Sequence, residues 1–404
     1  MELDKQKIYN KNCIEISDKI ESIVNSLVGV DTNKIKMNEK GMFEHFEINP
    51  LYSERKSLEE IMIEDKVPGL CIAVINNFKI EWVKAFGIKN AKTEEPVSIE
   101  TMFQAASISK LLVATVVLNL VEKGLLDLDE PINSKLKKWA IPSNQFTQDN
   151  EITLKHILTH SSGVNSPDGG FDREDNSAPS ILQVLKGEAP AKNHPVKVEF
   201  IPGSKQQYSN HGFIILEKLI EDITGKKLNE LAQEFIFKPL GMKDSLFGYP
   251  SEEIQKRMSF SHRNGVTYEP HIGLSPNIFG CGGLISTSLD LARFALGLIN
   301  AYQGENNSIL TQRIAQKMIC SQVKIDPHLW FGKTSFGLGV FLDERKDTFF
   351  FEHSGGNIPG AASEMIANPN TGQGAIIMTN SLTAHNRLIN SLLYTIAEEY
   401  GWSK

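Results

Sequence analysis

A serine and a lysine stand three residues apart at Ser107 and Lys110, within the stretch FQAASISK. In a helix that begins near Ser107, positions three apart share a face, so both side chains would lie on its first turn. A hydroxyl at a helix N-terminus faces free N–H groups and a dipole that stabilise developing negative charge. Burial in the same field would let part of the Lys110 population lose its proton and accept one from Ser107. The pair therefore predicts a serine nucleophile with a lysine base.

The Ser-x-x-Lys spacing alone is a weak signal, because a helix cap followed by a solvated lysine produces it too. Context favours Ser107, since a strand-like segment precedes it and the most apolar run of the chain, from Leu111 to Val121, follows it. The same spacing recurs outside that context at three places, Ser53/Lys56, Ser134/Lys137 and Ser321/Lys324.

A second candidate is QQYSNHG, where Tyr208 and Asn210 form the only Tyr-x-Asn pattern of the chain. A loop tyrosine held near a lysine can relay protons, while the Asn210 amide can orient Lys110 or bind a substrate amide. The structural alternative is a turn tyrosine followed by an asparagine that caps the next helix.

The third candidate is FFFEHSGGNIPG, in which an aromatic strand leads into His353, Ser354, Gly355 and Gly356. Glycines let a ligand approach a strand closely, and the Gly356 N–H could join the Ser107 N–H in an oxyanion hole. His353 could bind a substrate carboxylate or polarise the tyrosine, or it could be an ordinary half-exposed histidine at a strand end. Acyl transfer needs a nucleophile, a base and a donor pair around one carbonyl, so the three motifs support one another.

The elements that must position these motifs come from both ends of the chain. Residues 68–87 predict a β-hairpin with its turn at Asn76–Asn77, and four runs near the C-terminus predict further strands before a final helix. Helical periodicity dominates between them. We therefore expect an α/β (α+β) fold, an antiparallel β-sheet flanked by helices with an inserted all-helical domain and the active site at their seam. The expected parts are a 1–50 N-terminal extension, 51–110 with 325–404 as the sheet domain, and 111–324 as the helical domain.

Composition narrows the class of protein. A chain of 404 residues with 41% apolar and 23% charged residues is globular, and a net charge of −7 without a basic stripe argues against nucleic-acid binding. Four cysteines without a Cys-x-x-Cys pair predict neither a zinc site nor a disulfide scaffold. The longest apolar run is shorter than the roughly 20 residues of a membrane span. No secretory signal is visible, so we expect a cytoplasmic protein, or a secreted one if the N-terminus was altered.

Three other features are interpreted as structural. His156 and His160 in HILTHSSG have the spacing of zinc ligands but no nearby third ligand, so we expect packing roles and no metal. The segment from Lys333 to Ser335, Lys-Thr-Ser, lacks the glycine of the third candidate and should begin a strand. The polar stretch from Asn165 to Ser180 is either a rim over the pocket or a plain surface loop.

In chain order, SISK, YSN and HSG resemble the three signature motifs of the serine β-lactamase and penicillin-binding-protein superfamily. From about Val67 onward, VPGLCIAVI, HILTHSSG, FIPGSKQQYSN and GCGGLISTSLDLARF resemble sequence blocks of its class C β-lactamase-like branch. The resemblance implies an α/β domain with an all-helical domain and a covalent acyl-enzyme, without a metal or organic cofactor. By position it makes Ser107 the nucleophile, Lys110 the proton acceptor, Tyr208 the group that activates Ser107 and protonates the leaving group, and Asn210 a substrate contact.

His353 stands where β-lactamases and transpeptidases of the superfamily carry the lysine of Lys-Thr-Gly. A histidine is shorter and only partly charged near neutral pH, so recognition of a substrate carboxylate should weaken. We therefore expect a β-lactamase-like carboxylesterase whose partner is a small-molecule ester, amide or β-lactam. A D-amino-acid-specific peptidase, a weak β-lactamase, an acyltransferase and a non-enzymatic penicillin-binding sensor that stays acylated are alternatives. No oligomeric state is predicted.

Overall fold

The computed structural model describes residues 15–31, 36–37, 43–45, 49–167, 178–271, 273–306, 308–327, 332–344, 349–385 and 387–402. Nine strands form one antiparallel sheet, in the order β13-β14-β15-β16-β17-β18-β5-β6-β7. Its strands are β5 (Gly69–Asn76), β6 (Lys79–Asn90), β7 (Glu95–Pro96), β13 (Val323–Lys324), β14 (Ser335–Phe336), β15 (Phe341–Glu344), β16 (Phe349–Asn357), β17 (Ala361–Asn368) and β18 (Gln373–Thr379).

The predicted hairpin is confirmed as β5 and β6, and the central pairing joins β5 to β18, more than 290 residues away. Four smaller sheets complete the strand set, pairing β1 with β4, β2 with β3, β10 with β11, and β12 with both β8 and β9. Their bounds are β1 (Leu27–Asp31), β2 (Lys36–Met37), β3 (Phe43–His45), β4 (Asn49–Lys56), β8 (Phe103–Ala106), β9 (Leu246–Phe247), β10 (Ser261–Arg263), β11 (Val266–Tyr268) and β12 (Leu284–Ser286).

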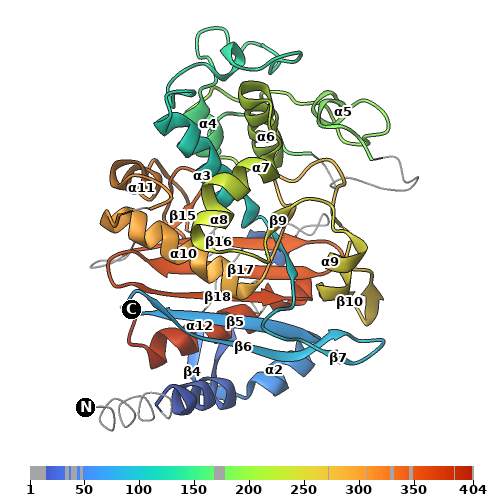
Figure 1. The fold of residues 1–404 in the computed structure, drawn as a ribbon, viewed down its shortest axis with the longest axis vertical. Helices are drawn as coiled ribbons and strands as arrows, with labels where there is room; N and C mark the ends of the chain where they lie inside the picture. Colours follow the sequence, from blue (N-terminus) through green and yellow to red (C-terminus); the bar gives the residue numbers. More distant parts are fainter. Residues whose placement is uncertain are drawn as a thin grey trace.

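Most of the described helices lie between β8 and β13 along the chain, and Figure 1 shows α4, α6 and α7 gathered at the end of the molecule opposite to α2 and β4. Residues 15–25 are also helical. The α-helices are α2 (Leu58–Glu64), α3 (Ser109–Glu122), α4 (Leu154–Leu158), α5 (Ile181–Lys186), α6 (Asn210–Thr224), α7 (Leu228–Ala232), α8 (Lys238–Leu240), α9 (Glu252–Arg257), α10 (Ser288–Gln303), α11 (Gln312–Met318) and α12 (Leu388–Glu399). Three short segments are η1 (Ile132–Ser134), the π-helical η2 (Gln233–Phe237) and η3 (Leu382–His385).

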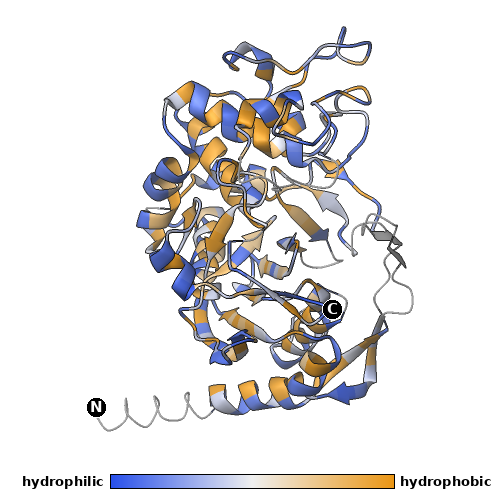
Figure 2. Cartoon of the chain, turned by 90° about the vertical axis from the view of Figure 1, so that its right-hand side faces the viewer, coloured by the Kyte–Doolittle hydropathy of each residue, from blue (hydrophilic) through white to orange (hydrophobic). Residues whose placement is uncertain are grey.

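Alternate residues of β5 face different cores, because successive side chains of a strand point to opposite faces. Cys71, Ala73 and Ile75 belong to the core that includes residues of α3, α6 and α10. Leu70 and Ile72 face a second core, built with α12, α2 and the helix of residues 15–25. The sheet is thus buried on both sides, and Figure 2 shows many hydrophobic residues in the strands and in the helices around them.

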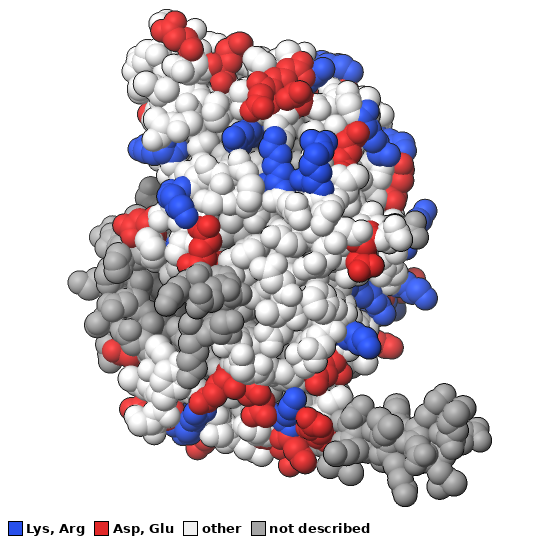
Figure 3. All heavy atoms as spheres, turned by 90° about the vertical axis from the view of Figure 1, so that its left-hand side faces the viewer, with Lys and Arg blue, Asp and Glu red and all other residues white. Residues whose placement is uncertain are grey.

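This architecture confirms the expected fold class, while the residue boundaries of the two domains remain a prediction. In the described part of the predicted N-terminal extension, β1 forms an antiparallel pair with β4, which continues to Lys56. None of the described helices has the length and apolar character to cross a membrane. On the face drawn in Figure 3, basic side chains lie among acidic ones.

The helix after the candidate nucleophile begins at Ser109, two residues later than the spacing predicts. β8 runs to Ala106, and Ser107 lies in the turn between strand and helix. Most residues of α3 are fully buried, as expected for a helix that is apolar all round.

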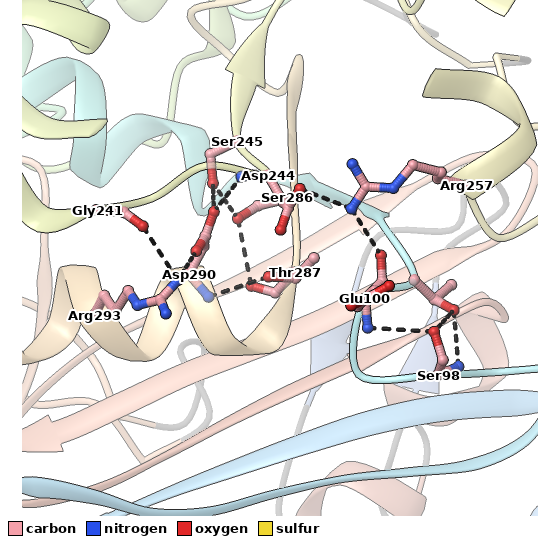
Figure 4. Close-up of polar contacts among 11 residues, drawn as sticks. Ser98, Glu100, Gly241, Asp244, Ser245, Arg257, Ser286, Thr287, Asp290 and Arg293 are labelled. Atoms are coloured by element: carbon pink, nitrogen blue, oxygen red, sulfur yellow. Dashed lines mark hydrogen bonds and ion pairs between the residues drawn. The ribbon is translucent and has the colours of Figure 1, made fainter. Parts of the chain in front are cut away.

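A buried carboxylate, Asp290, fastens the start of α10 to the loop before β9 (Figure 4). It accepts hydrogen bonds from the Asp244 N–H at 2.8 Å and the Ser245 hydroxyl at 3.0 Å, and it pairs with Arg293 at 2.6 Å. Its own N–H donates to Thr287, the N-cap of the helix, at 3.1 Å. Because β12 ends beside this cap and pairs with β8, the network supports the strand that leads into Ser107.

A second buried carboxylate, Glu217 on α6, holds the loop before β12. One of its oxygens accepts hydrogen bonds from the Phe279 N–H at 2.9 Å and the Gly280 N–H at 2.8 Å. Burial raises the pKa of Glu217 to about 7, although these two donors act to lower it. The carboxyl group therefore changes its protonation state near neutral pH inside the fold.

We expect Asp290→Ala to lower the free energy of unfolding by about 2–4 kcal/mol, because it leaves buried donors without an acceptor and Arg293 without its partner. Urea denaturation measures this change. Arg257→Ala is the matched control, since it removes an ion pair with Asp244 whose side chains are 42% and 30% exposed. Such a pair contributes about 0–1 kcal/mol. Equal losses in the two variants would contradict the assignment of Asp290 as the anchor.

A different outcome is expected for Glu217→Gln, whose effect should depend on pH. The pKa of Glu217 is raised above its ordinary 4.5, so the stabilisation from its bound proton is complete below pH 4.5 and is lost as pH rises through 7. The wild type should lose about 3 kcal/mol of stability from this group over that window. A glutamine oxygen can accept both N–H groups without titrating, so the variant should gain relative stability as pH rises. Denaturation at pH 5, 6, 7 and 8 tests this, and parallel curves for the two proteins would disprove it.

Candidate active site

Ser107 and Lys110 are in contact, with 3.0 Å between the Lys110 Nζ and the Ser107 Oγ. The Lys110 side chain is fully buried, and its Nζ also donates to the carbonyl of Cys281. Within the described part of the chain, Lys110 pairs with no carboxylate. A buried amine at hydrogen-bond distance from a hydroxyl has the geometry of a base beside a nucleophile.

The turn that presents Ser107 is held in a conformation that L-residues seldom adopt. Ala106 has a φ of 49°, in the left-handed region. The Ser109 hydroxyl donates to the Ala106 carbonyl at 2.5 Å and accepts the Leu284 N–H of β12 at 2.9 Å. The strained residue is thus kept in place by the neighbouring strand, as is common next to reactive groups.

The second motif lies over the lysine. The Lys110 Nζ is 4.9 Å from the centre of the Tyr208 ring and 5.7 Å from that of Phe213, so two aromatic faces border the amine. Ser209, rather than Asn210, caps α6 by accepting the Gly212 N–H at 3.1 Å. The side-chain amide of Asn210 makes no hydrogen bond to the residues that the structure describes, whereas its backbone N–H donates to the Ser166 hydroxyl. The capping alternative for Asn210 is therefore wrong, and its amide is available for a ligand.

The third motif reaches the same place along β16. A side chain at Gly355 would put its Cβ 2.3 Å from the Ala105 carbonyl oxygen and 3.1 Å from the Ser107 nitrogen. Only glycine permits this approach of the strand to the turn. The His385 Nε2 donates to the Gly355 carbonyl at 2.9 Å. Because a trans peptide unit is planar, the Gly356 N–H of that unit points away from the carbonyl and away from His385.

His353 differs from both sequence interpretations of its state. Its side chain is 1% exposed, so it is not a half-exposed histidine. Burial, reinforced by the charge of Lys110, lowers the pKa of His353 to about 3. The expectation of a partly charged ring near neutral pH is therefore wrong, because desolvation and a nearby cation both oppose protonation. Its Nδ1 donates to the Ser354 carbonyl at 2.6 Å, which leaves Nε2 as a buried acceptor without a partner among the described residues.

Lys333, in the Lys-Thr-Ser segment that partly matches the third motif, pairs with a buried carboxylate instead of joining the site. Lys333 precedes β14, which starts at Ser335, so the expected strand start is confirmed. The Lys333 Nζ lies 3.3 Å from a carboxylate oxygen of Glu352, and both side chains are buried. Burial opposes the charge on Lys333, but the carboxylates of Glu352 and Glu364 outweigh it and raise its pKa. This lysine is charged and neutralised within the sheet domain.

The tertiary structure thus brings the three motifs together: Ser107 contacts Lys110, Gly355 lies against the Ser107 turn, and the ring centres of Tyr208 and His353 are 6.3 Å apart. Sequence reasoning did not anticipate the Cys281 carbonyl as a partner of Lys110. The sequence signal for this contact was the run of small residues in GCGGLISTS, which allows a loop to lie close to the site. Residues 168–177 of the proposed rim lie outside the described residues. No group of three or more potential metal ligands occurs in the part of the chain that the structure covers.

A cavity of about 670 Å³ lies elsewhere, between residues 24–25, α2, β6 and the β10–β11 hairpin. None of the predicted site residues lines it. Its serine, Ser57, is engaged as the N-cap of α2 in a capping box with Glu60. The chemistry therefore points to Ser107 rather than to this cavity.

Comparison with known proteins identifies relatives of this chain. Residues 55–395 match the family model described as Beta-lactamase. Penicillin-binding protein 4 of Amycolatopsis lactamdurans is 24% identical over 81% of this chain and 84% of its own length. The D-alanyl-D-alanine-carboxypeptidase/endopeptidase AmpH of Escherichia coli K12 is 26% identical over 59% of this chain and 60% of its own length.

A solved structure extends the comparison to the fold. The octameric penicillin-binding protein homologue from Pyrococcus abyssi superposes with a TM-score of 0.69 and 27% identity, covering 85% of this chain and 77% of that one. The family match spans the strands of both chain ends and the helices between them. The chain belongs to the β-lactamase family.

Proposed function

We propose that this protein is a serine hydrolase that acts on small uncharged esters or amides through a covalent acyl-enzyme at Ser107. The observation that carries the proposal is the 3.0 Å contact between the Ser107 Oγ and the buried Lys110 Nζ. It occurs at a strained turn against a glycine-bearing strand. A nucleophile, a base and backbone donors around one point are what acyl transfer needs.

In the proposed reaction, Lys110 as a neutral amine takes the proton of Ser107 while the Oγ attacks the substrate carbonyl carbon. The N–H groups of Ser107 and Gly356 hold the developing oxyanion. Tyr208 passes a proton to the leaving alcohol or amine as its bond to the acyl carbon breaks, and Lys110 replaces the proton on Tyr208. Water then attacks the acyl-enzyme, loses its proton to the same pair, and releases the acid and Ser107.

The substrate preference follows from the charge of the third motif. His353 is uncharged at neutral pH, and the buried Lys333 is already paired with Glu352. The site residues thus offer no cation beyond Lys110 to a substrate carboxylate, which favours neutral esters over β-lactams. A D-peptidase or amidase is the second candidate, because the Asn210 amide is free to bind a substrate amide and the relative AmpH is named as a peptidase.

Ser107→Ala should reduce hydrolysis of p-nitrophenyl acetate by at least about 10³-fold, because the nucleophile is removed. Lys110→Arg should reduce it by about 10²–10⁴-fold, because a guanidinium does not accept the proton. Turnover of a chromogenic cephalosporin by the wild type should be much slower than ester turnover. The ester assay follows absorbance of the released nitrophenol.

Ser134→Ala is the matched control, since Ser134 and Lys137 have the same spacing on the surface. It should retain wild-type turnover. Ester turnover that survives Ser107→Ala would refute the assignment of the nucleophile. A stoichiometric burst without further turnover would indicate a sensor that stays acylated.

The pH profile tests the state of His353. Since its pKa is lowered to about 3, the ring is protonated only below that pH and stays neutral throughout the range above 4. The profile of kcat between pH 5 and 8 should therefore keep its shape in His353→Asn, even where the rate itself falls. An inflection near pH 6.5 that disappears in the variant would show that His353 titrates in the working range.

A further inference from the structure

His160 lies directly beside Tyr208 although no step of the proposed reaction uses it. The centres of the two rings are 4.3 Å apart, and the His160 side chain is 1% exposed. The sequence interpretation assigned His160 to loop packing. Its position against the proposed proton-transfer residue calls for a closer account of its contacts.

Two hydrogen bonds connect His160 to the residues on either side of Tyr208. The Gln207 N–H donates to the His160 carbonyl at 2.7 Å, and the Ser209 N–H donates to the His160 Nδ1 at 3.1 Å. Tyr208 therefore lies between two residues whose backbone N–H groups both donate to His160. Its ring lies against the ring of that same histidine, with the two planes tilted by 33°.

The second bond determines the state of the imidazole. A backbone N–H can only donate, so Nδ1 is the acceptor and the ring proton is on Nε2. Burial, with the charge of Lys110 next, lowers the pKa of His160 well below its ordinary value. Nε2 meets no acceptor among the described residues. The bond from Ser209 is thus the hydrogen bond that orients this ring, and it persists at neutral pH.

The remaining faces of the ring are packed as well. The ring centre of Phe213 lies 5.2 Å from that of His160, and the ring centre of Phe336 lies 5.0 Å away. His160 itself has a φ of 53°, a backbone conformation tolerated best by glycine and asparagine. The backbone and the ring of His160 are therefore both held in place. Contacts with His160 consequently restrict the movement of the Tyr208 ring.

We propose that His160 is a positioning residue that clamps the 207–209 segment and holds the Tyr208 ring over the Lys110 amine. The inference rests on the proposed function, because it gives Tyr208 a part in proton transfer. His160 acts only through the tyrosine. Positional errors near an ångström are costly in such sites, so losing the clamp should slow the chemical step more than substrate binding.

The test is a double-mutant cycle between His160→Phe and Tyr208→Phe, with kcat and KM for p-nitrophenyl acetate as readouts. Phenylalanine keeps an aromatic ring but removes the acceptor for the Ser209 N–H. His160→Phe alone should lower kcat by about 10–100-fold with KM changed less than about 3-fold. In the Tyr208→Phe background the same substitution should change kcat less than about 2-fold. Circular dichroism and thermal unfolding establish that each variant is folded.

His160→Asn serves as the conservative variant. Asparagine suits the positive φ, and its side-chain oxygen can accept the Ser209 N–H, so kcat should stay within about 5-fold of wild type. This variant decides the matter if His160→Phe does not fold. An Asn variant whose kcat is more than about 10-fold below wild type, or a loss that is independent of Tyr208, would overturn the clamp.

Equal losses of kcat for His160→Phe in both backgrounds would show a general structural role for His160 and would leave the proposed hydrolase intact. Wild-type kcat in Tyr208→Phe alone would refute the role of Tyr208 in the proposed function, and the clamp with it. If ester turnover is too slow for the cycle, the rate of Ser107 labelling by a fluorophosphonate, followed by mass spectrometry, replaces kcat. The cycle then has the same expected and opposing results.

Discussion

The fully buried amine of Lys110 is the feature on which the rest of the site depends. A charge removed from water is costly unless dipoles or counter-charges replace the lost solvent. Here the Cys281 carbonyl, the Ser107 hydroxyl and two aromatic faces surround the amine, and no described carboxylate pairs with it. None of these groups carries a negative charge, so the amine is held by dipoles and aromatic faces rather than by an ion pair. The same burial, together with the positive charge, keeps His353 and His160 neutral.

The surroundings of Lys110 are themselves held by buried polar groups. Glu217 binds the two amides that precede Cys281, so a carboxylate in the middle of α6 supports the carbonyl that meets the lysine. Asp290 fastens the start of α10, next to the strand that pairs with β8. The described partners of the two carboxylates are loop amides, the Ser245 hydroxyl and Arg293, not Ser107 or Lys110. Glu217 and Asp290 hold two loops next to the strained turn in fixed positions. Such positioning matters because an active site tolerates little displacement of its groups.

The third motif bears on the proposed substrate preference through its buried histidine. At His353 the fold provides a buried position beside Lys110, where a second charge would be repelled and desolvated. A neutral ring avoids both of these penalties. In the proposed reaction the covalent chemistry belongs to Ser107 and Lys110, and His353 supplies no cation for an anionic substrate group.

Much of this protein was determined by sequence alone, because the relevant signals are local. The β-branched and aromatic runs on both sides of Asn76–Asn77 predicted β5 and β6, and the apolar run after Ser107 predicted α3, because strands and buried helices favour those residues. The motifs around Ser107, Tyr208 and His353 also predicted the fold class and the residues that meet at the site. The match is close because each motif carries residue types that acyl transfer requires.

Only the tertiary structure decided what depends on contacts between distant segments. The expectation for His353 was wrong because its protonation depends on burial and on Lys110, neither of which is visible at position 353. The start of α3 was placed two residues early because pairing of β8 with β12 extends the strand into the turn. The Cys281 carbonyl and the contact of His160 with Ser209 were missed for the same reason. Backbone groups have no sequence signature, and free energy from burial and long-range hydrogen bonds exists only once the chain has folded.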